Sequence, residues 1–134
     1  MVLGFKERFK KPILDGDKIH TIRLDKGGRW KEGNSIQFAT GVRTKNYDEF
    51  TTGVCFSTQE IEFKWHNHNK GKSNESWGVQ VFIDGVDVTN GDIIDCLCNN
   101  DGFKDRVEFF TWDAWDKTDF KGKIIHWTNF RYKV

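Results

Sequence analysis

The sequence predicts an α+β fold: a small β-barrel with short helices near the N-terminus and before the last strand. Runs of alternating apolar and polar residues, bounded by turn residues, indicate several strands joined by long hairpins. Helical spacing of apolar residues occurs only near the start of the chain and shortly before its end. The length of 134 residues has room for one core, so residues 1–134 are expected to form a single domain.

The first forty residues contain two expected strand regions after an opening strand and helix. A short apolar run indicates the opening strand, and helical spacing follows until Asp15 and Gly16 end it. Pro12 keeps this helix short or lies in its first turn. The expected elements are a strand over 2–5, a helix over 7–14, a β-branched strand over 19–24, a glycine-rich loop over 26–33 and a half-buried strand over 34–39.

Residues 41–88 are expected to form enlarged hairpins. Apolar residues alternate with polar or charged ones through most of this region, as in half-buried strands. Asp84 followed by Gly85 is typical of a two-residue hairpin turn. The expected elements are strand over 51–65, a polar loop or hairpin tip over 66–76, a strand over 78–83 and a last short strand over 86–88.

Helical signals return after residue 88. Thr89 followed by Asp92 resembles a capping box with Asp in place of the usual Glu, and Ile93 and Leu97 lie on the apolar face that follows. The expected elements are a helix over 90–98, a break over 99–102, a second helix that includes Val107 and Ala114 and ends near Trp115, and a strand over 123–132.

Composition excludes several classes of protein. Aromatic residues make up 15% of the chain, and 21 Lys and Arg nearly balance 20 Asp and Glu, which is typical of a folded chain. No apolar run approaches the roughly 20 residues that span a bilayer, and the basic N-terminus lacks a secretory signal. Cys55, Cys96 and Cys98 suggest no disulfide framework. We therefore expect a cytoplasmic protein with no membrane contact.

Charge is divided unevenly along the chain. Residues 1–31 carry nine Lys or Arg against four acids, and residues 120–134 carry four against none, whereas residues 84–119 carry three against ten. If the two basic ends are neighbours in the fold, they form one positive surface that attracts a polyanion. The alternative is a solvated mixture of charges.

The predicted strand over 19–24 and the turn before it contain the most informative polar residues. The turn lets Lys18 project into a mouth of the barrel, and Thr21 and Arg23 share one face of the strand while His20 lies on the other. Ammonium, guanidinium and hydroxyl groups together suit a phosphate or the edge of a base. The alternative for Arg23 is an ion pair with an acid of the late segment.

These residues belong to the string FKKPILDGDKIHTIR, which resembles the signature of the ASCH family, a branch of the PUA-like β-barrels. That signature is a short helix ending in I-L-x-G-x-K, followed by a strand T-x-R. Its counterparts here are Ile13, Leu14, Gly16, Lys18, Thr21 and Arg23. Asp101, Gly102 and Phe103 resemble the D-G-F segment of the family. The resemblance covers the first 40 residues and residues 89–115, while 41–88 match only as generic strands.

The resemblance implies a PUA-like barrel without a cofactor that binds RNA or a nucleotide in a basic cleft. The cleft would be lined by Lys18, Thr21, Arg23 and the segment from Asp101 to Phe103, and His20 is also expected to bind the ligand. Some small members of the family instead hydrolyse the acetyl amide of N4-acetylcytidine with a Lys, a Thr and an acid. The counterparts of that catalytic set are Lys18, Thr21 and Asp101, so an amide hydrolase is the alternative function.

Catalysis by this set would require activation of a weak nucleophile. A threonine hydroxyl is unreactive near neutral pH unless a base removes its proton. Lys18 can serve as that base only if burial or nearby cations lower its pKa. Asp101 would orient the lysine or the substrate amine, although a close carboxylate would also raise the pKa of the lysine.

Other features suggest weaker sites. Trp30 lies in a glycine-rich basic loop and is the best candidate among the tryptophans to stack on a base, with a core position as the alternative. The histidines of 66–68 and the cysteines of 96–98 complete no four-ligand set with zinc spacing, so no metal site is expected. A third possible function is a protein-interaction module that uses the aromatic hairpins over 51–83.

Overall fold

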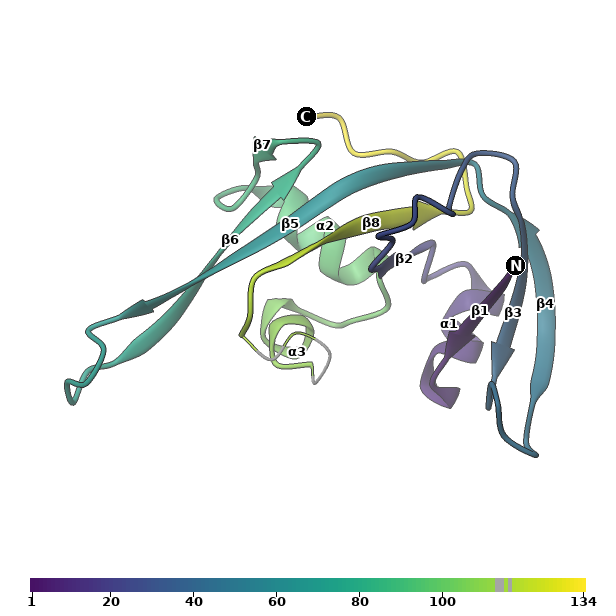
Figure 1. Ribbon diagram of the computed structural model, residues 1–134, viewed down its shortest axis with the longest axis horizontal. Helices are drawn as coiled ribbons and strands as arrows, with labels where there is room; N and C mark the ends of the chain where they lie inside the picture. The colour runs from purple at the N-terminus through teal and green to yellow at the C-terminus, as the bar shows by residue number, and fades with distance from the viewer. Residues whose placement is uncertain (113–114, 116) are drawn as a thin grey trace.

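Two separate β-sheets form the frame of the protein in the computed structural model, which describes residues 1–112, 115 and 117–134 (Figure 1). The smaller sheet consists of β1 (Val2–Phe5), β3 (Ser35–Thr40) and β4 (Asp48–Val54), in the order β1-β3-β4. The larger sheet consists of β2 (His20–Arg23), β5 (Ser57–His68), β6 (Ser76–Ile83), β7 (Val86–Asp87) and β8 (Phe120–His126), in the order β2-β8-β5-β6-β7.

Short helical elements connect these strands. They are the 3₁₀ turn η1 (Glu7–Phe9) and the α-helices α1 (Lys10–Asp15), α2 (Asp92–Asn100) and α3 (Arg106–Phe110). Helix α3 packs on the larger sheet, where the ring centroids of Phe109 and Phe110 lie 5.9 and 5.7 Å from that of Phe63. None of the described helices has the length and apolar character needed to cross a membrane.

The prediction of a β-barrel is wrong. Strand β3 pairs with β1 and β4, whereas β2 pairs only with β8 among the described strands. Each sheet therefore keeps free edges, while a barrel requires strand pairing around a closed ring. Strands β2 and β3, which follow one another in the chain, join different sheets. Asp25 accepts hydrogen bonds from the backbone N–H groups of Arg29 and Trp30, which folds the segment between these strands into a local turn instead of a hairpin.

The two sheets meet over a shared hydrophobic core. Phe38 of β3 contacts Trp127, just after β8, with ring centroids 4.9 Å apart. Arg23 of β2 donates a hydrogen bond to the backbone carbonyl of Gly4 in β1 at 2.7 Å. These contacts place β1 and β2 next to one another although they belong to different sheets.

The first late helix begins two residues after its predicted start. Thr89 does not cap it, because the Thr89 hydroxyl donates to Asp87 and accepts from the backbone N–H of Val81. The N-cap of α2 is Gly91, which has no side chain to accept a hydrogen bond.

The second late helix is shorter than predicted. Helix α3 starts at Arg106, where the Asp105 carboxylate accepts from the backbone N–H of Glu108, and it ends at Phe110. The predicted helical residue Ala114 lies outside the described residues. The last strand, β8, likewise ends at His126 and does not continue to residue 132.

The hairpin of β5 and β6 extends away from the rest of the molecule as a long arm (Figure 1). Strand pairing continues to His68 and Ser76, so the turn occupies only 69–75 of the segment predicted as a loop or hairpin tip. Where this hairpin joins the body, Phe63 and Ile61 of β5 are fully buried. The arm therefore grows directly out of a strand that belongs to the core.

Candidate functional site

A cavity of about 270 Å³ lies where β1, β2 and the segment after α2 meet. Its walls combine polar side chains with aromatic rings. The polar side chains are those of Lys6, Lys18, Thr21, Arg23 and Asp101. The aromatic rings are those of Phe5, Phe9, Phe103, Trp112 and Trp115. The two segments that the sequence singled out, 16–23 and 101–103, therefore meet around one cavity.

The turn between α1 and β2 places Lys18 in the wall of this cavity. Gly16 ends α1 with a φ of 82°, a left-handed conformation that glycine adopts without steric cost. The backbone N–H groups of Asp17 and Lys18 both donate to the Pro12 carbonyl, at 2.9 and 3.0 Å. The Lys18 ammonium then donates to the backbone carbonyl of Asp101 at 2.6 Å and lies 3.2 Å from Oδ1 of the same residue. One residue thus fixes the ammonium through two oxygens.

Gly102 allows the chain after α2 to approach Lys18 closely. Its φ is 94°, and a Cβ at this position would lie 3.1 Å from the ring of Phe9 and 3.2 Å from Cδ of Lys18. Both the conformation and the lack of space therefore favour glycine. The approach is supported from the other side, where the backbone N–H of Ile19 donates to the carbonyl of Asn100 at 2.9 Å.

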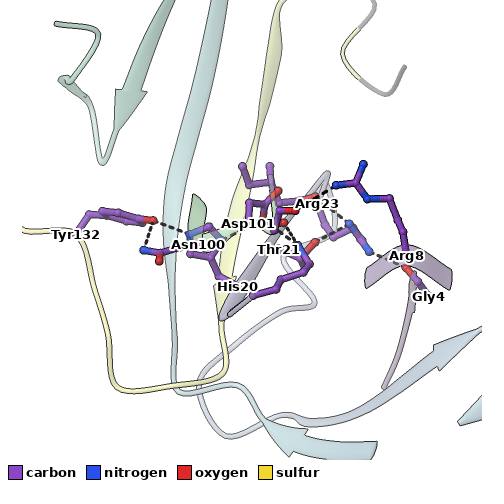
Figure 2. Close-up of polar contacts among 11 residues, drawn as sticks. Gly4, Arg8, His20, Thr21, Arg23, Asn100, Asp101 and Tyr132 are labelled. Carbon is purple, nitrogen blue, oxygen red and sulfur yellow. Dashed lines mark hydrogen bonds and ion pairs between the residues drawn. The ribbon is translucent and has the colours of Figure 1, made fainter. Parts of the chain in front are cut away.

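Thr21 and Arg23 point toward one another from the same face of β2 (Figure 2). Nη1 of Arg23 donates to Oγ1 of Thr21 at 2.8 Å, and Nη2 donates to the carbonyl of Gly4. Arg23 forms no ion pair with any carboxylate among the described residues, so the alternative of a partner in the late acidic segment is not found there. Arg23 therefore brings a positive charge to the cavity.

Aromatic rings pack against both cations of the wall. Nζ of Lys18 lies 4.9 Å from the ring centroid of Phe9 and 5.6 Å from that of Phe5. The guanidinium of Arg23 lies 5.1 Å from the ring centroid of Phe5. The electron-rich faces of these rings attract a cation, and they restrict the positions that its side chain can take.

A second group of cations lies beside the cavity. The Arg8 guanidinium lies 5.3 Å from the ring centroids of Phe103 and of Trp112, and the Lys6 ammonium lies 4.9 Å from the Trp112 ring. Arg8 also pairs with Glu108 at 3.0 Å. These two cations also come from the basic N-terminal segment, which therefore supplies Lys6, Arg8, Lys18 and Arg23 to this region.

Burial changes the titration of the central pair. Burial, helped by the charges of Arg23 and Arg8, lowers the pKa of Lys18 from 10.5 to about 8, although the Asp101 carboxylate acts to raise it. Burial alone would raise the pKa of Asp101, but Lys18 and the hydrogen bond from His20 outweigh it and hold that pKa below its usual value. The pair is ionised at neutral pH, and part of the Lys18 amine is neutral near pH 8.

Two predicted ligand-binding residues, His20 and Trp30, do not line the cavity. His20 lies on the opposite face of β2, where its ring bridges Asp101 and Tyr132 and is fully buried (Figure 2). Trp30 is 8% exposed and belongs to the hydrophobic core. The hydrogen bond from its backbone N–H to Asp25 draws the glycine-rich loop toward the protein.

Sequence reasoning missed Phe5, Trp112 and Tyr132. Phe5 and Trp112 line the cavity. Both are aromatic residues close in sequence to the two motifs, and this proximity could have indicated their place in the site. Tyr132 lies 2.6 Å from Nε2 of His20 through its hydroxyl, but 112 positions separate the two residues in the chain. No local pattern could indicate that contact.

Metal-binding arrangements are not found in the described part of the chain. No group of three or more His, Cys, Asp or Glu side chains there could hold a metal ion. Cys55 and Cys98 are buried, Cys96 is exposed, and all three are free thiols. The rings of His66 and His68 lie on the hairpin arm with centroids 6.5 Å apart.

A scan against protein-family models, a search of curated proteins and a search of solved structures each found no match to this chain. The ASCH resemblance therefore stays a prediction that depends on the residues of its two motifs. The function has to be inferred from the geometry and charge of the cavity itself.

Proposed function

We propose that the protein is a cytoplasmic ASCH-type module that binds one base of an RNA or a nucleotide in the cavity beside Lys18. One observation carries this proposal: Lys18, Thr21 and Arg23 share a single cavity with five aromatic rings. Aromatic rings stack on the faces of bases, while Lys, Arg and Thr bind phosphate oxygens or base edges. The combination suits a ligand that is both aromatic and rich in hydrogen-bond acceptors.

Charge and size narrow the choice of ligand. Lys18 is compensated by Asp101, but Arg23 has no carboxylate partner among the described residues, so the cavity favours a ligand with an anionic group or a carbonyl oxygen. Its volume of about 270 Å³ lies just below the range of about 300–1,000 Å³ that is usual for drug-sized ligands. A single nucleobase or nucleoside is the matching size.

Binding is tested with cytidine 5′-monophosphate and a short single-stranded RNA, using tryptophan fluorescence because Trp112 and Trp115 line the cavity. We expect Arg23→Gln to weaken binding of both by about tenfold, since a charged hydrogen-bond donor is lost. We expect RNA affinity to fall steeply between about 50 and about 200 mM salt.

Lys72→Gln is the matched control, because it removes one positive charge from the exposed hairpin tip. It should leave the affinity for the mononucleotide unchanged. Equal weakening by Arg23→Gln and Lys72→Gln, or RNA binding without a salt dependence, would contradict the proposal.

A second function, hydrolysis of an acylated nucleoside such as N4-acetylcytidine, is favoured by a specific observation. Lys18 and Thr21 line the same cavity, and burial lowers the pKa of Lys18 to about 8, so that a neutral amine is available. This amine can accept the Thr21 hydroxyl proton while the oxygen attacks the acetyl carbon. The hydrogen bond from Arg23 to Oγ1 stabilises negative charge that develops there.

Two further steps complete the hydrolysis. The proton held by Lys18 passes to the amide nitrogen as the carbon–nitrogen bond breaks, which releases cytidine and leaves an acetyl ester on Thr21. Water then attacks the ester carbon, and Lys18 again carries the proton to the departing Thr21 oxygen, which releases acetate. Neither a metal nor a cofactor is required for these steps.

Incubation of the protein with N4-acetylcytidine, followed by measurement of free cytidine, tests the second function. We expect Lys18→Met and Thr21→Val each to reduce turnover by about 10²-fold or more, with Lys72→Gln unchanged. If the wild-type protein gives no turnover, or Lys18→Met is as active as wild type, the hydrolase function is excluded and the binding function stands.

Binding of a protein partner through the hairpin arm stays a prediction. Its strongest feature is Trp77 of β6, which is 43% exposed. The inner face of the arm is partly occupied, because the rings of Trp65 and Phe110 lie 6.0 Å apart between centroids. The arm thus has less free aromatic surface than its sequence suggests.

A further inference from the structure

We propose that His20 and Tyr132, neither of which lines the cavity, are positioning residues that act through Asp101 to hold the Lys18 amine at the cavity wall. The inference deepens the proposed function, because the use of this amine by a ligand rests on that function. It also makes a residue of the segment after β8 part of the site.

A continuous chain of hydrogen bonds leads from the cavity into the interior (Figure 2). Nζ of Lys18 lies 3.2 Å from Oδ1 of Asp101, and this oxygen lies 3.1 Å from Nδ1 of His20. Nε2 of His20 lies 2.6 Å from the hydroxyl oxygen of Tyr132, to which the Asn100 amide donates at 3.2 Å. Lys18, His20, Asp101 and Tyr132 are each at most 6% exposed, so bulk water does not compete for these partners.

The donors and acceptors of this chain fit together in one arrangement. An ionised Asp101 only accepts, so the ring proton of His20 lies on Nδ1. Burial lowers the pKa of His20, against the influence of Asp101, which keeps the ring neutral and makes Nε2 an acceptor. The Tyr132 hydroxyl therefore donates to Nε2 and accepts from Asn100. Moving the ring proton to Nε2 would leave a bare nitrogen facing a carboxylate in a buried site.

The arrangement affects Lys18 because both donors use the same carboxylate oxygen. The N–H of His20 takes part of the negative charge of Asp101 that the ammonium would otherwise receive. Without this donor the carboxylate would attract the ammonium more strongly and raise the pKa of Lys18. The charged or titratable groups that face Lys18 are Asp101, Arg23 and Arg8, and those that face His20 are Asp101, Lys18, Tyr132 and His126.

Tyr132 is held in place independently of its hydroxyl. Its backbone N–H donates to Oε1 of Gln59 at 2.8 Å, and its carbonyl accepts from Nε2 of Gln59 at 3.0 Å. Gln59 lies in β5 and is 2% exposed. A tyrosine fixed by both backbone groups presents its hydroxyl at a defined point, and removal of the hydroxyl alone should leave the ring where it is.

The test is a titration of Lys18, followed by the NMR signal of its ε-carbon in protein labelled with ¹³C-lysine and assigned by the loss of that signal in Lys18→Met. We expect a wild-type midpoint at about pH 8. We expect His20→Phe to raise the midpoint by about one pH unit and Tyr132→Phe by roughly half a unit. The pH at which cytidine 5′-monophosphate binding declines should move upward with it.

Ile124→Val is the matched control, because Ile124 is fully buried in β8 opposite Ile22 and its side chain has no polar group that could join the hydrogen-bonded chain. It should lower stability while leaving the Lys18 midpoint unchanged. If Tyr132→Phe folds and its Lys18 midpoint equals that of wild type, the inference is overturned. If His20→Phe fails to fold, the result for Tyr132→Phe alone decides. A shifted midpoint without nucleotide binding in wild type supports the positioning role and contradicts only the proposed function.

Discussion

The two faces of β2 carry polar residues that differ in how their charge is compensated. On the cavity face, Arg23 is a charged donor without a carboxylate partner among the described residues. On the interior face, both ring nitrogens of His20 have partners, Asp101 and Tyr132. Neighbouring residues of one strand thus serve different purposes: a charge without a counterion indicates where a ligand binds, and fully paired groups indicate what supports the site.

A larger cavity elsewhere in the protein illustrates the same distinction. A cavity of about 360 Å³ is lined by the segment from Val86 to Val88, the start of α2 and Val134. Its one acidic side chain, Asp87, already accepts from the backbone N–H and the hydroxyl of Thr89. Volume alone would select this cavity, whereas the cavity beside Lys18 combines aromatic rings with a guanidinium that has no carboxylate partner among the described residues.

The largest expected effect comes from Asp101→Asn, because Asp101 serves both faces of β2. The substitution leaves the buried Lys18 ammonium without its counterion, and we expect the free energy of unfolding to fall by about 3 kcal/mol. Urea denaturation near neutral pH measures it. A double-mutant cycle with Lys18→Met should recover part of the loss. Simple additivity of the two substitutions would mean that the pair is not coupled.

A moderate effect is expected from alkaline pH, and it tests the cavity face alone. The folded-state pKa of Lys18 is about 8 and its ordinary value is 10.5, so between these values the unfolded chain binds more protons than the folded chain. The contribution of Lys18 to the free energy of unfolding therefore rises from about pH 8 toward pH 10.5. Urea denaturation from about pH 7.5 to about pH 9.5 should show this rise in wild type relative to Lys18→Met.

The raised pKa of Tyr132 changes the free energy of unfolding in the opposite direction and over a different pH range. Burial raises this pKa above its ordinary value of 10.0, so the contribution of Tyr132 is fully present below pH 10 and is lost at higher pH. Measurements that stop below pH 10 therefore avoid the titration of Tyr132. Burial also raises the pKa of the Cys55 and Cys98 thiols above 9.0, and this contribution is common to wild type and Lys18→Met, so the difference between their curves reports Lys18. Parallel curves for wild type and Lys18→Met over that range would contradict the assigned shift.

The smallest effect is expected from Glu108→Gln, which changes a partly exposed ion pair outside the buried chain of hydrogen bonds. Glu108 pairs with Arg8, but the Arg8 side chain is 42% exposed and also contacts the carbonyl of Gly102. Because exposed ion pairs contribute little, we expect the melting temperature to change by no more than about two degrees. A loss as large as that of Asp101→Asn would show that the distinction between buried and exposed partners is wrong.

Much of the local structure could be predicted from the sequence, because alternation and turn residues act over short distances. The long hairpin follows from such signals, whereas the meeting of Lys18 with Asp101 was expected only from the resemblance of their two motifs to the ASCH family. The closed barrel was wrong because alternation identifies strands but not their partners, and β2 and β3 join different sheets. The inward position of Trp30 likewise depends on tertiary packing, which alternation does not encode.

The interior support of the site could not be predicted for a different reason. His20 was expected among the ligand-binding residues because it lies in the motif, yet strand alternation places it behind the cavity. Its partner Tyr132 comes from the far end of the chain and carries no recognisable pattern. Contacts between residues so distant in sequence are decided by tertiary packing, which residue spacing does not report.

The free edges of the two sheets have a consequence for any molecule that enters the cavity. Gly4 and Phe5 belong to β1 of one sheet, whereas Thr21 and Arg23 belong to β2 of the other, and all four line the cavity. A ligand in the cavity therefore contacts both sheets, and no continuous strand pairing connects these sheets in the described chain. Ligand binding should therefore reduce the relative motion of the two sheets, so that the bound protein is more rigid at their junction than the free protein.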